Sequence, residues 1–276
     1  MTTEFTYKTA FTHGGKFHAD DVFSTALLRI LNPDIEIIRG FQIPEGFDGI
    51  VYDIGMGEFD HHQKEKRIRT NGIPYAAFGL LWERYGCLLL EEEQARKLEN
   101  NLVEPIDRSD NSPEANPLSD AIGWMNPSYD ETEKTEECFW RAVEMAKQML
   151  EAGIHKLKKA AQAVNTVKAA IEKSDGKTLI LESFCPWRDA VKETTIDFVI
   201  FPSQRGGYNV CSVPSDQESG EQKIRFPERL GGITQEELEK ETGIPGFRFC
   251  HPGGFICAAD TLETAVAIAE WTRSNG

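Results

Sequence analysis

The order of apolar segments near the start of the chain constrains the fold most strongly. Runs of β-branched and aromatic residues predict strands at residues 6–12, 35–39 and 50–54, and apolar residues at helical spacing predict a helix at residues 22–31. Strands that alternate with helices favour a mostly parallel sheet with helices on its faces. We therefore expect an α/β fold in this part of the chain.

Histidine and aspartate residues gather at the ends of these segments. His13 and His18 flank a glycine pair after the first strand, Asp20 lies where the first helix begins, and Asp53 ends the third strand. Ligands of open α/β sheets bind beyond the carboxyl ends of the strands. Asp20 also has a simpler interpretation, because an acidic residue in the first turn stabilises a helix through its dipole.

The segment Asp60-His61-His62 follows soon after the third strand. A carboxylate beside two imidazoles offers the oxygen and nitrogen ligands that suit Mn, Zn or Fe, although a solvated loop is the alternative. Farther along, Asp107 follows an apolar residue at the end of a predicted helix, whereas we interpret Asp110 as a loop capping residue. These residues predict a pair of divalent ions, or a single zinc ion with three protein ligands.

The densest basic run of the chain, residues 64–69, comes directly after the histidine pair. Its cations can hold a substrate phosphate beside bound metal. The alternative is a solvated surface that has no part in function.

Beyond the first domain, residues 129–174 are helical by composition, with an interruption expected near Gly153. Strands return after Ser174. We expect an N-terminal, mostly parallel sheet flanked by helices, a helical connection, and a smaller C-terminal α+β domain. Their predicted bounds are residues 1–127, 128–174 and 175–276.

Composition excludes several classes of protein. The formal net charge of −15 disfavours a long grip on duplex nucleic acid, but leaves room for a short single strand or a small phosphorylated substrate. The six cysteines are scattered and form no metal-binding pair, so we expect reduced thiols. No apolar run is long enough to cross a membrane, and the first residues resemble neither a secretory nor a mitochondrial signal. We therefore expect a cytoplasmic protein.

Seven motifs carry a resemblance to known proteins. They lie at residues 12–21, 51–55, 59–63, 106–107, 185–188, 199–202 and 249–256. In these motifs the chain resembles the DHH phosphoesterase superfamily and, within it, the melanocyte-proliferating-gene (Myg) exonuclease family.

The resemblance implies two Mn²⁺ or Mg²⁺ ions in the N-terminal domain. It implies that the metal ligands are His13, His18, Asp20, Asp53, His61 and Asp107, with Asp53 between the ions. Asp53, His61 and His62 are the expected catalytic residues. His62 is expected to bind metal or substrate phosphate, and Asp60 to support the histidine pair.

The resemblance also implies that the C-terminal domain binds substrate. The expected residues are Arg248, His251, Gly253 and Gly254, with Arg188 and Arg205 behind them. The backbone amides of the glycine pair can form an anion-binding nest, and a plain turn between strands is the alternative.

The function that this resemblance implies is 3′–5′ exonuclease activity on RNA or short oligonucleotides, by two-metal hydrolysis. One alternative is a phosphohydrolase that acts on pyrophosphate or a nucleotide. Another is a binding module that retains the fold without catalysis. A homo-oligomer is also compatible with the sequence.

Overall fold

The computed structural model describes residues 4–215 and 220–275. The chain divides into two compact units, Met1–Lys158 and Lys159–Gly276, and the division falls inside the long helix α6 (Thr135–Glu172). Each unit is described by itself.

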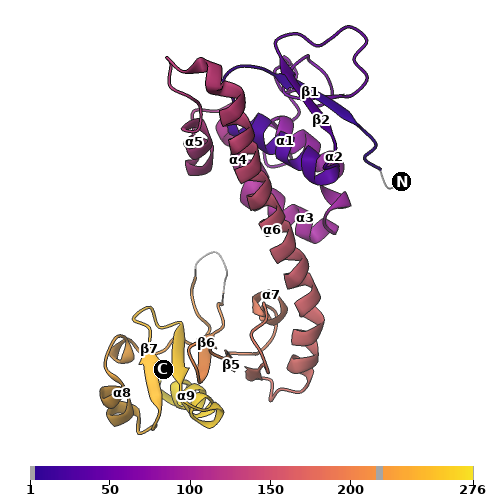
Figure 1. The fold of residues 1–276 in the computed structure, drawn as a ribbon. Helices are drawn as coiled ribbons and strands as arrows, with labels where there is room; N and C mark the ends of the chain where they lie inside the picture. Colours follow the sequence, from indigo (N-terminus) through magenta and orange to yellow (C-terminus); the bar gives the residue numbers. More distant parts are fainter. Residues whose placement is uncertain (1–3, 216–219, 276) are drawn as a thin grey trace. The chain divides into compact units, whose positions relative to one another are not determined.

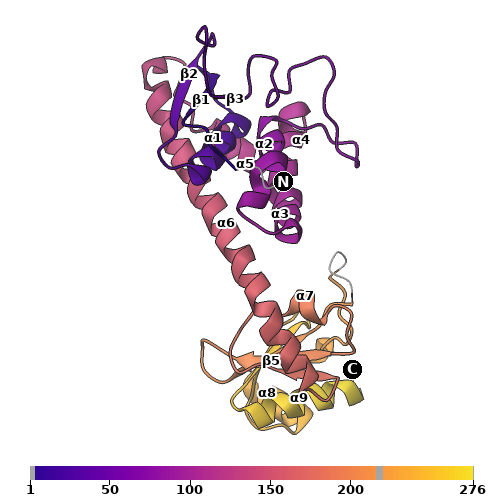
Figure 2. The same cartoon turned by 90° about the vertical axis from the view of Figure 1, so that its right-hand side faces the viewer.

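The first unit is built on a small parallel sheet. Strand β1 (Thr9–His13) lies between β2 (Glu36–Gly40) and β3 (Ile50–Val51), and both neighbours run parallel to it. Helix α1 (Ala19–Leu31) makes the connection from β1 to β2 (Figure 2). This confirms the predicted α/β class and the parallel pairing of the first strands.

Strand β3 is shorter than predicted. It ends at Val51, because the backbone of Asp53 has a φ of +54° and that of Met56 a φ of +59°, which no strand can continue. The turn that follows carries the Asp60-His61-His62 segment back toward the end of β1.

Further helices pack around α1 and against one another, and they supply most of the core of the first unit. They are α2 (Ala77–Tyr85), α3 (Glu92–Leu98), α4 (Glu104–Asn111), α5 (Pro117–Gly123) and the first part of α6 (Figure 1). Phe23 of α1 and Phe78 of α2 pack together with a ring centroid distance of 5.5 Å, and both are fully buried. This packing sets α1 and α2 side by side.

Two helices run farther than the sequence indicated. A π-helical turn at Glu99–Val103 joins α3 to α4, because Pro105 in the first turn of α4 cannot donate a backbone hydrogen bond. Helix α6 continues through Gly153, where an added Cβ would lie 3.3 Å from the Leu98 side chain. A glycine costs a helix only about 1 kcal/mol, and here it permits close packing against α3.

The second unit contains a five-stranded mixed sheet in the order β4-β5-β6-β8-β7. The strands are β4 (Thr178–Ile180), β5 (Phe198–Pro202), β6 (Tyr208–Ser212), β7 (Phe247–Cys250) and β8 (Ile256–Ala259). Strands β4 and β5 pair in parallel, and the other neighbours in this sheet are antiparallel. Helices α8 (Gln235–Thr242) and α9 (Leu262–Asn275) contribute to the core on one face, and the short helix α7 (Arg188–Val191) packs on the other. In the described residues, no helix combines the length and the hydropathy needed to cross a membrane.

Candidate metal centre

Asp53 lies at the centre of the polar cluster in the first unit. Its Oδ2 is 3.2 Å from Nε2 of His13, and its Oδ1 is 3.2 Å from Nε2 of His61. The turn that holds it is fixed by its own backbone amide, which donates to the carbonyl of Phe59 at 2.9 Å. Aspartate tolerates the left-handed backbone that this turn requires, so the strained turn aims the carboxylate between two imidazoles.

Potential metal-binding atoms surround this carboxylate. Three groups each bring their donor atoms within 4.8 Å of one another: His13 with His18 and Asp21, Asp53 with His61 and His62, and Asp20 with His61 and Asp110, the last two sharing His61. Asp21 and Asp110 were not among the predicted ligands. Five of the six predicted ligands are in this cluster, and Asp107 is not.

The electrostatics of the cluster indicate a shortage of positive charge. Burial raises the pKa of Asp20, and the neighbouring charges of Asp53 and Asp110 raise it further. Burial likewise raises the pKa of Asp110, and it raises that of Asp21 to about 7 although His13 opposes the shift. A bound divalent cation would relieve this crowding of carboxylates.

Two histidines compensate part of the negative charge. Burial opposes ionisation of Asp53, but the contacts with His13 and His61 outweigh it and lower the pKa of this carboxyl to about 2. Burial of the His13 ring is similarly outweighed by Asp53 and Asp21, which raise the pKa of this imidazole to about 9. The metal-free cluster therefore retains protons that metal ions would displace.

Two buried carboxylate oxygens of the cluster also favour metal binding. Oδ2 of Asp21 and Oδ1 of Asp53 are buried, and neither accepts a hydrogen bond of good geometry from any described residue, although Nε2 of His13 lies 3.5 Å from the first and Nε2 of His61 3.2 Å from the second. Buried polar atoms without a hydrogen bond are rare, and a bound ion is one way to satisfy them. The remaining donors are imidazole nitrogens and carboxylate oxygens, which suit Mn, Zn or Fe.

Asp20 has two roles in this geometry. Its carboxylate accepts the backbone amides of Phe78 at 2.7 Å and Ala77 at 3.0 Å, and so caps the start of α2. The expected capping role is thus directed at a neighbouring helix instead of its own. A carboxylate has about four lone-pair sites, so these two bonds leave room for a metal ion.

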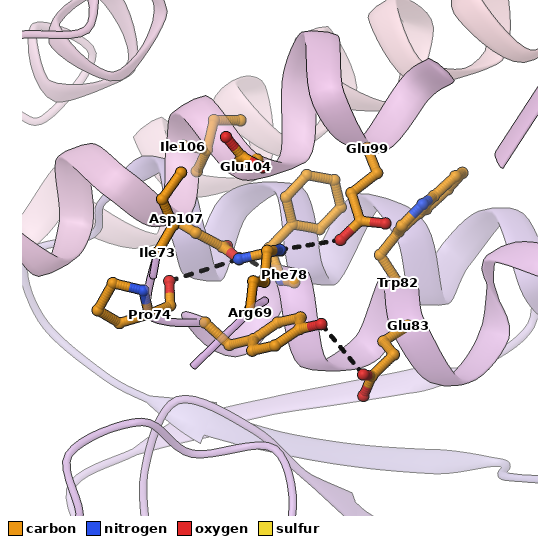
Figure 3. Close-up of polar contacts among 12 residues, drawn as sticks. Arg69, Ile73, Pro74, Phe78, Trp82, Glu83, Glu99, Glu104, Ile106 and Asp107 are labelled. Atoms are coloured by element: carbon orange, nitrogen blue, oxygen red, sulfur yellow. Dashed lines mark hydrogen bonds and ion pairs between the residues drawn. The ribbon is translucent and has the colours of Figure 1, made fainter. Parts of the chain in front are cut away.

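Asp107 is held away from the cluster. It is fully buried, its Oδ2 accepts from Nη2 of Arg69 at 2.7 Å, and its Oδ1 accepts from the amide of Gly79 at 3.1 Å. Arg69 also donates to Glu99 at 2.9 Å, so the three side chains form an internal network (Figure 3). These contacts favour a structural role for Asp107 over the expected metal ligation, and we propose Asp110 as the ligand from this helix.

Asp110 takes the position that was expected for Asp107. It lies in the last turn of α4, not in a loop, with its Oδ2 3.2 Å from Nε2 of His61. The Asp-x-x-Asp spacing was visible in the sequence and puts both carboxylates on neighbouring positions of one helix. Which of them faces the histidines depends on the π-helical turn and on Arg69.

Asp60 contacts the second histidine of its motif. Its Oδ1 lies 2.7 Å from Nδ1 of His62, and its Oδ2 accepts from the amide of Met56 at 2.6 Å. The ring of His62 is exposed and lies beside that of His61, at a centroid distance of 4.3 Å. This contact is the one that a supporting role for Asp60 requires.

The cluster opens into a cavity of about 890 Å³. Its lining includes the basic side chains Lys16 and Lys66, and Nζ of Lys66 donates to Oδ1 of Asn111 at 2.7 Å. Of the basic run at residues 64–69, Arg69 is internal and Arg67 pairs with Glu83. Lys66 is thus the member of the run that lines this cavity.

The C-terminal residues expected to bind substrate occupy three places. Arg205 and Arg248 line one cavity of the second unit, and Arg188 lines another. The third place is a turn between β7 and β8, where the amide of Gly253 donates to Nδ1 of His251 at 2.9 Å and that of Gly254 to its carbonyl at 2.8 Å. Because both glycine amides donate within the turn, the geometry favours the alternative of a plain turn between strands over an anion nest.

The α/β fold and this cluster of carboxylates and histidines define a metal-dependent phosphoesterase. The chain belongs to the MYG1_exonuc family, described as an uncharacterised protein family (UPF0160), whose profile matches residues 9–272. The proteins named MYG1 exonuclease in Homo sapiens and Rattus norvegicus are each 30% identical to it over 96% of this chain. The alignments cover 85% of the human protein and 84% of the rat protein.

Another relative is the MYG1 protein YER156C of Saccharomyces cerevisiae, which is 26% identical over 94% of both chains. Among solved structures, RecJ in complex with Mg²⁺ from Thermus thermophilus aligns with 97% of this chain and 50% of its own. Its identity is 13% and its TM-score 0.30, too low to support a structural argument.

Proposed function

We propose that this protein is a metal-dependent exonuclease that shortens RNA or short oligonucleotides from the 3′ end. The observation that carries the proposal is the position of Asp53, whose two oxygens face His13 and His61 at 3.2 Å each. A carboxylate with imidazoles on both sides is the arrangement that lets one residue bridge two divalent ions.

We propose two ions, Mn²⁺ or Mg²⁺, each with its own set of ligands and with Asp53 between the two sets. His13, Asp21 and His18 would hold one ion, and Asp20, His61 and Asp110 the other. When bound, such a pair lowers the pKa of a water molecule and stabilises the attacking and leaving oxygens of an in-line displacement. The low pKa of Asp53 keeps its carboxylate ionised at neutral pH, as a bridging ligand must be.

Other side chains of the cavity are suited to hold the substrate. The exposed ring of His62 is oriented by Asp60 and offers its second nitrogen to a phosphoryl oxygen. Lys16 and Lys66 bring positive charge to the same cavity and would neutralise phosphates on either side of the scissile bond. The net charge of −15 supports a short substrate over a long duplex.

The direction of cleavage and the preference for RNA rest on the family resemblance, and relatives of this chain are named exonucleases. A cytoplasmic location and a homo-oligomeric state remain predictions. The alternative function, hydrolysis of pyrophosphate or a nucleotide, would use the same metal cluster and differ only in the substrate that occupies the cavity.

The test uses RNA labelled at its 5′ end, incubated with the purified chain and Mn²⁺ after removal of bound metal. A ladder that shortens from the 3′ end supports the proposal, whereas phosphate release from pyrophosphate alone supports the alternative. Binding without any turnover in either assay would leave a binding module.

The diagnostic variant is Asp53→Asn, because asparagine tolerates the positive φ that alanine disfavours. It should abolish turnover while the chain remains folded. The control is Asp34→Ala, which removes an exposed carboxylate of the same unit and should retain full activity. Full activity of the Asp53→Asn variant would refute the proposal.

A further inference from the structure

An arginine with a buried side chain lies behind the loop that carries His13 and His18. Arg39 is in β2, where it pairs in register with Thr12 of β1, one residue before His13. Its side chain is only 2% exposed, so the guanidinium is not available to bind substrate. Any role of Arg39 in function must therefore act through the groups that it contacts.

On one side, the guanidinium contacts the proposed ligands of one metal ion. Its Nη2 donates to the carbonyl of Gly15 at 2.9 Å and lies 3.8 Å from Oδ2 of Asp21. That oxygen is also 3.5 Å from Nε2 of His13. Gly15 belongs to the loop between His13 and His18, so Arg39 holds the backbone between two ligands and lies beside the third.

On its other side, the guanidinium is anchored to the first turns of α6. Its Nη1 lies 2.6 Å from Oε1 of Glu136, and its Cζ lies 3.8 Å from the centroid of the Phe139 ring. Phe139 is fully buried and packs edge-on against Phe17 of the same loop, with a centroid distance of 5.7 Å. A cation that lies over an aromatic face and pairs with a carboxylate is fixed in both position and orientation.

The positive charge of Arg39 by itself would oppose metal binding. A guanidinium 3.8 Å from Oδ2 of Asp21 repels a divalent cation that binds the same oxygen. The planar guanidinium offers several donors in fixed directions, and here they bond a loop carbonyl and a helix carboxylate at the same time. Its presence beside the cluster therefore favours a role in placing the ligands over a role through charge.

We propose that Arg39 is a positioning residue for one of the two metal ions, the ion assigned to His13, His18 and Asp21, called here the His13 ion. Through Gly15 and Asp21 it fixes the ligand loop against α6. The inference rests on the proposed function, since it requires the pair of ions, and it names a residue on which the binding of one ion alone depends. Its signature is a selective loss of the His13 ion.

The experiment follows the ions that the metal-free chain binds. Bound metal is removed with EDTA, the chelator is dialysed away, and the full chain is titrated with Mn²⁺ by calorimetry and by electron paramagnetic resonance. Two Mn²⁺ ions that share a carboxylate give an exchange-coupled spectrum, whereas a single ion gives the hyperfine pattern of mononuclear Mn²⁺. Arg39→Met should bind the His13 ion at least about tenfold more weakly and keep the affinity of the other ion, so the mononuclear spectrum should persist.

Arg39→Lys separates positioning from charge. It keeps the positive charge but cannot bond Gly15 and Glu136 with one rigid fork, so the His13 ion should again be weakened. If Arg39 acted through charge alone, Arg39→Lys would bind both ions normally and Arg39→Met would bind them more tightly. Either of these two results would overturn the inference.

The anchor on α6 offers a test that leaves the buried guanidinium in place. Glu136→Gln removes the exposed carboxylate that pairs with Nη1, and it should weaken the His13 ion by about two- to fivefold. The adjacent Glu137→Gln, also exposed, is the control and should bind both ions like the unaltered chain. Equal loss of both ions in the Arg39 and Glu136 variants would show a general structural role and overturn the inference.

The same titrations distinguish this inference from the function on which it rests. A coupled pair of ions in the unaltered chain that also survives in every Arg39 variant counts against the inference alone. An unaltered chain that binds no coupled pair counts against the proposed function, and the inference falls with it.

Discussion

The Nη2 atom of Arg69 lies 2.7 Å from Oδ2 of Asp107 in the interior of the first unit. Asp107 is fully buried, and the guanidinium of Arg69 also contacts Glu99 (Figure 3). The same guanidinium lies over the ring of Tyr75, 3.8 Å from its centroid. An added Cβ at Gly79 would lie 1.8 Å from Oδ2 of Asp107, so glycine is needed beside the pair. The pair therefore belongs to the scaffold behind the metal centre.

Removal of this arginine should destabilise the protein strongly. Arg69→Met leaves Asp107 buried without its counter-charge, which costs about 3–5 kcal/mol in the free energy of unfolding. Urea denaturation measures the loss. The double variant Arg69→Met with Asp107→Asn should recover part of the stability, because no uncompensated charge remains. A single variant as stable as the unaltered chain would contradict the internal role of Arg69.

Asp107 and Asp110 should have opposite phenotypes. Asp110→Asn removes a ligand 3.2 Å from His61, so the affinity for Mn²⁺ should fall at least about tenfold while the fold is retained. Asp107→Asn should lower the melting temperature and leave metal affinity near that of the unaltered chain. Calorimetric titration with Mn²⁺ and thermal denaturation separate the two effects. Loss of metal affinity in the Asp107 variant alone would restore the assignment made from the sequence.

Asn111 should position His61 for metal binding. Its Oδ1 lies 3.4 Å from Nδ1 of His61 and accepts from Lys66 at 2.7 Å, while its Nδ2 donates to the carbonyl of Tyr75 at 3.1 Å. A partner at Nδ1 orients the ring so that Nε2 faces the metal, and loss of such partners typically costs about 10–100-fold in affinity. Asn111→Ala should show a loss of this order in Mn²⁺ titrations, and the neighbouring Ser112→Ala should not. Equal affinities would show that His61 needs no such support.

Metal binding should strengthen as the pH rises. The pKa of His13 in the metal-free chain is raised to about 9 from an unfolded value of about 6.5, so its contribution to stability is complete below about pH 6.5 and is lost as the pH rises through about 9. A metal ligand must be neutral imidazole, so Mn²⁺ has to displace this proton. Calorimetry across this window should show a rising apparent affinity with proton release, and His13→Ala should flatten the rise. An affinity independent of pH would contradict the assignment of His13.

The order of segments was sufficient to predict the first sheet. Short apolar runs and one amphipathic helix specify a parallel sheet whose strand ends meet, which is why His13, Asp53 and His61 were expected together and are found together. These residues are close in sequence to regular elements, and their placement follows from local structure and the handedness of the connection. The α+β character of the second unit followed from the same kind of pattern.

Other parts depended on packing that no local pattern contains. Which of Asp107 and Asp110 faces the histidines depends on the π-helical turn before α4 and on Arg69, which lies 38 residues before Asp107. The sequence predicts an anion nest at Gly253-Gly254, but in the structure both backbone amides donate to His251. The continuity of α6 through Gly153 likewise reflects close packing against Leu98.

The most direct test of the metal centre is anomalous scattering from crystals of the protein soaked with Mn²⁺. The structure predicts two peaks on either side of the Asp53 carboxylate, one within bonding distance of His13 and the other within bonding distance of His61 and Asp110. Peaks elsewhere, or an active enzyme with no peak beside Asp53, would contradict the central claim that this carboxylate holds the catalytic ions.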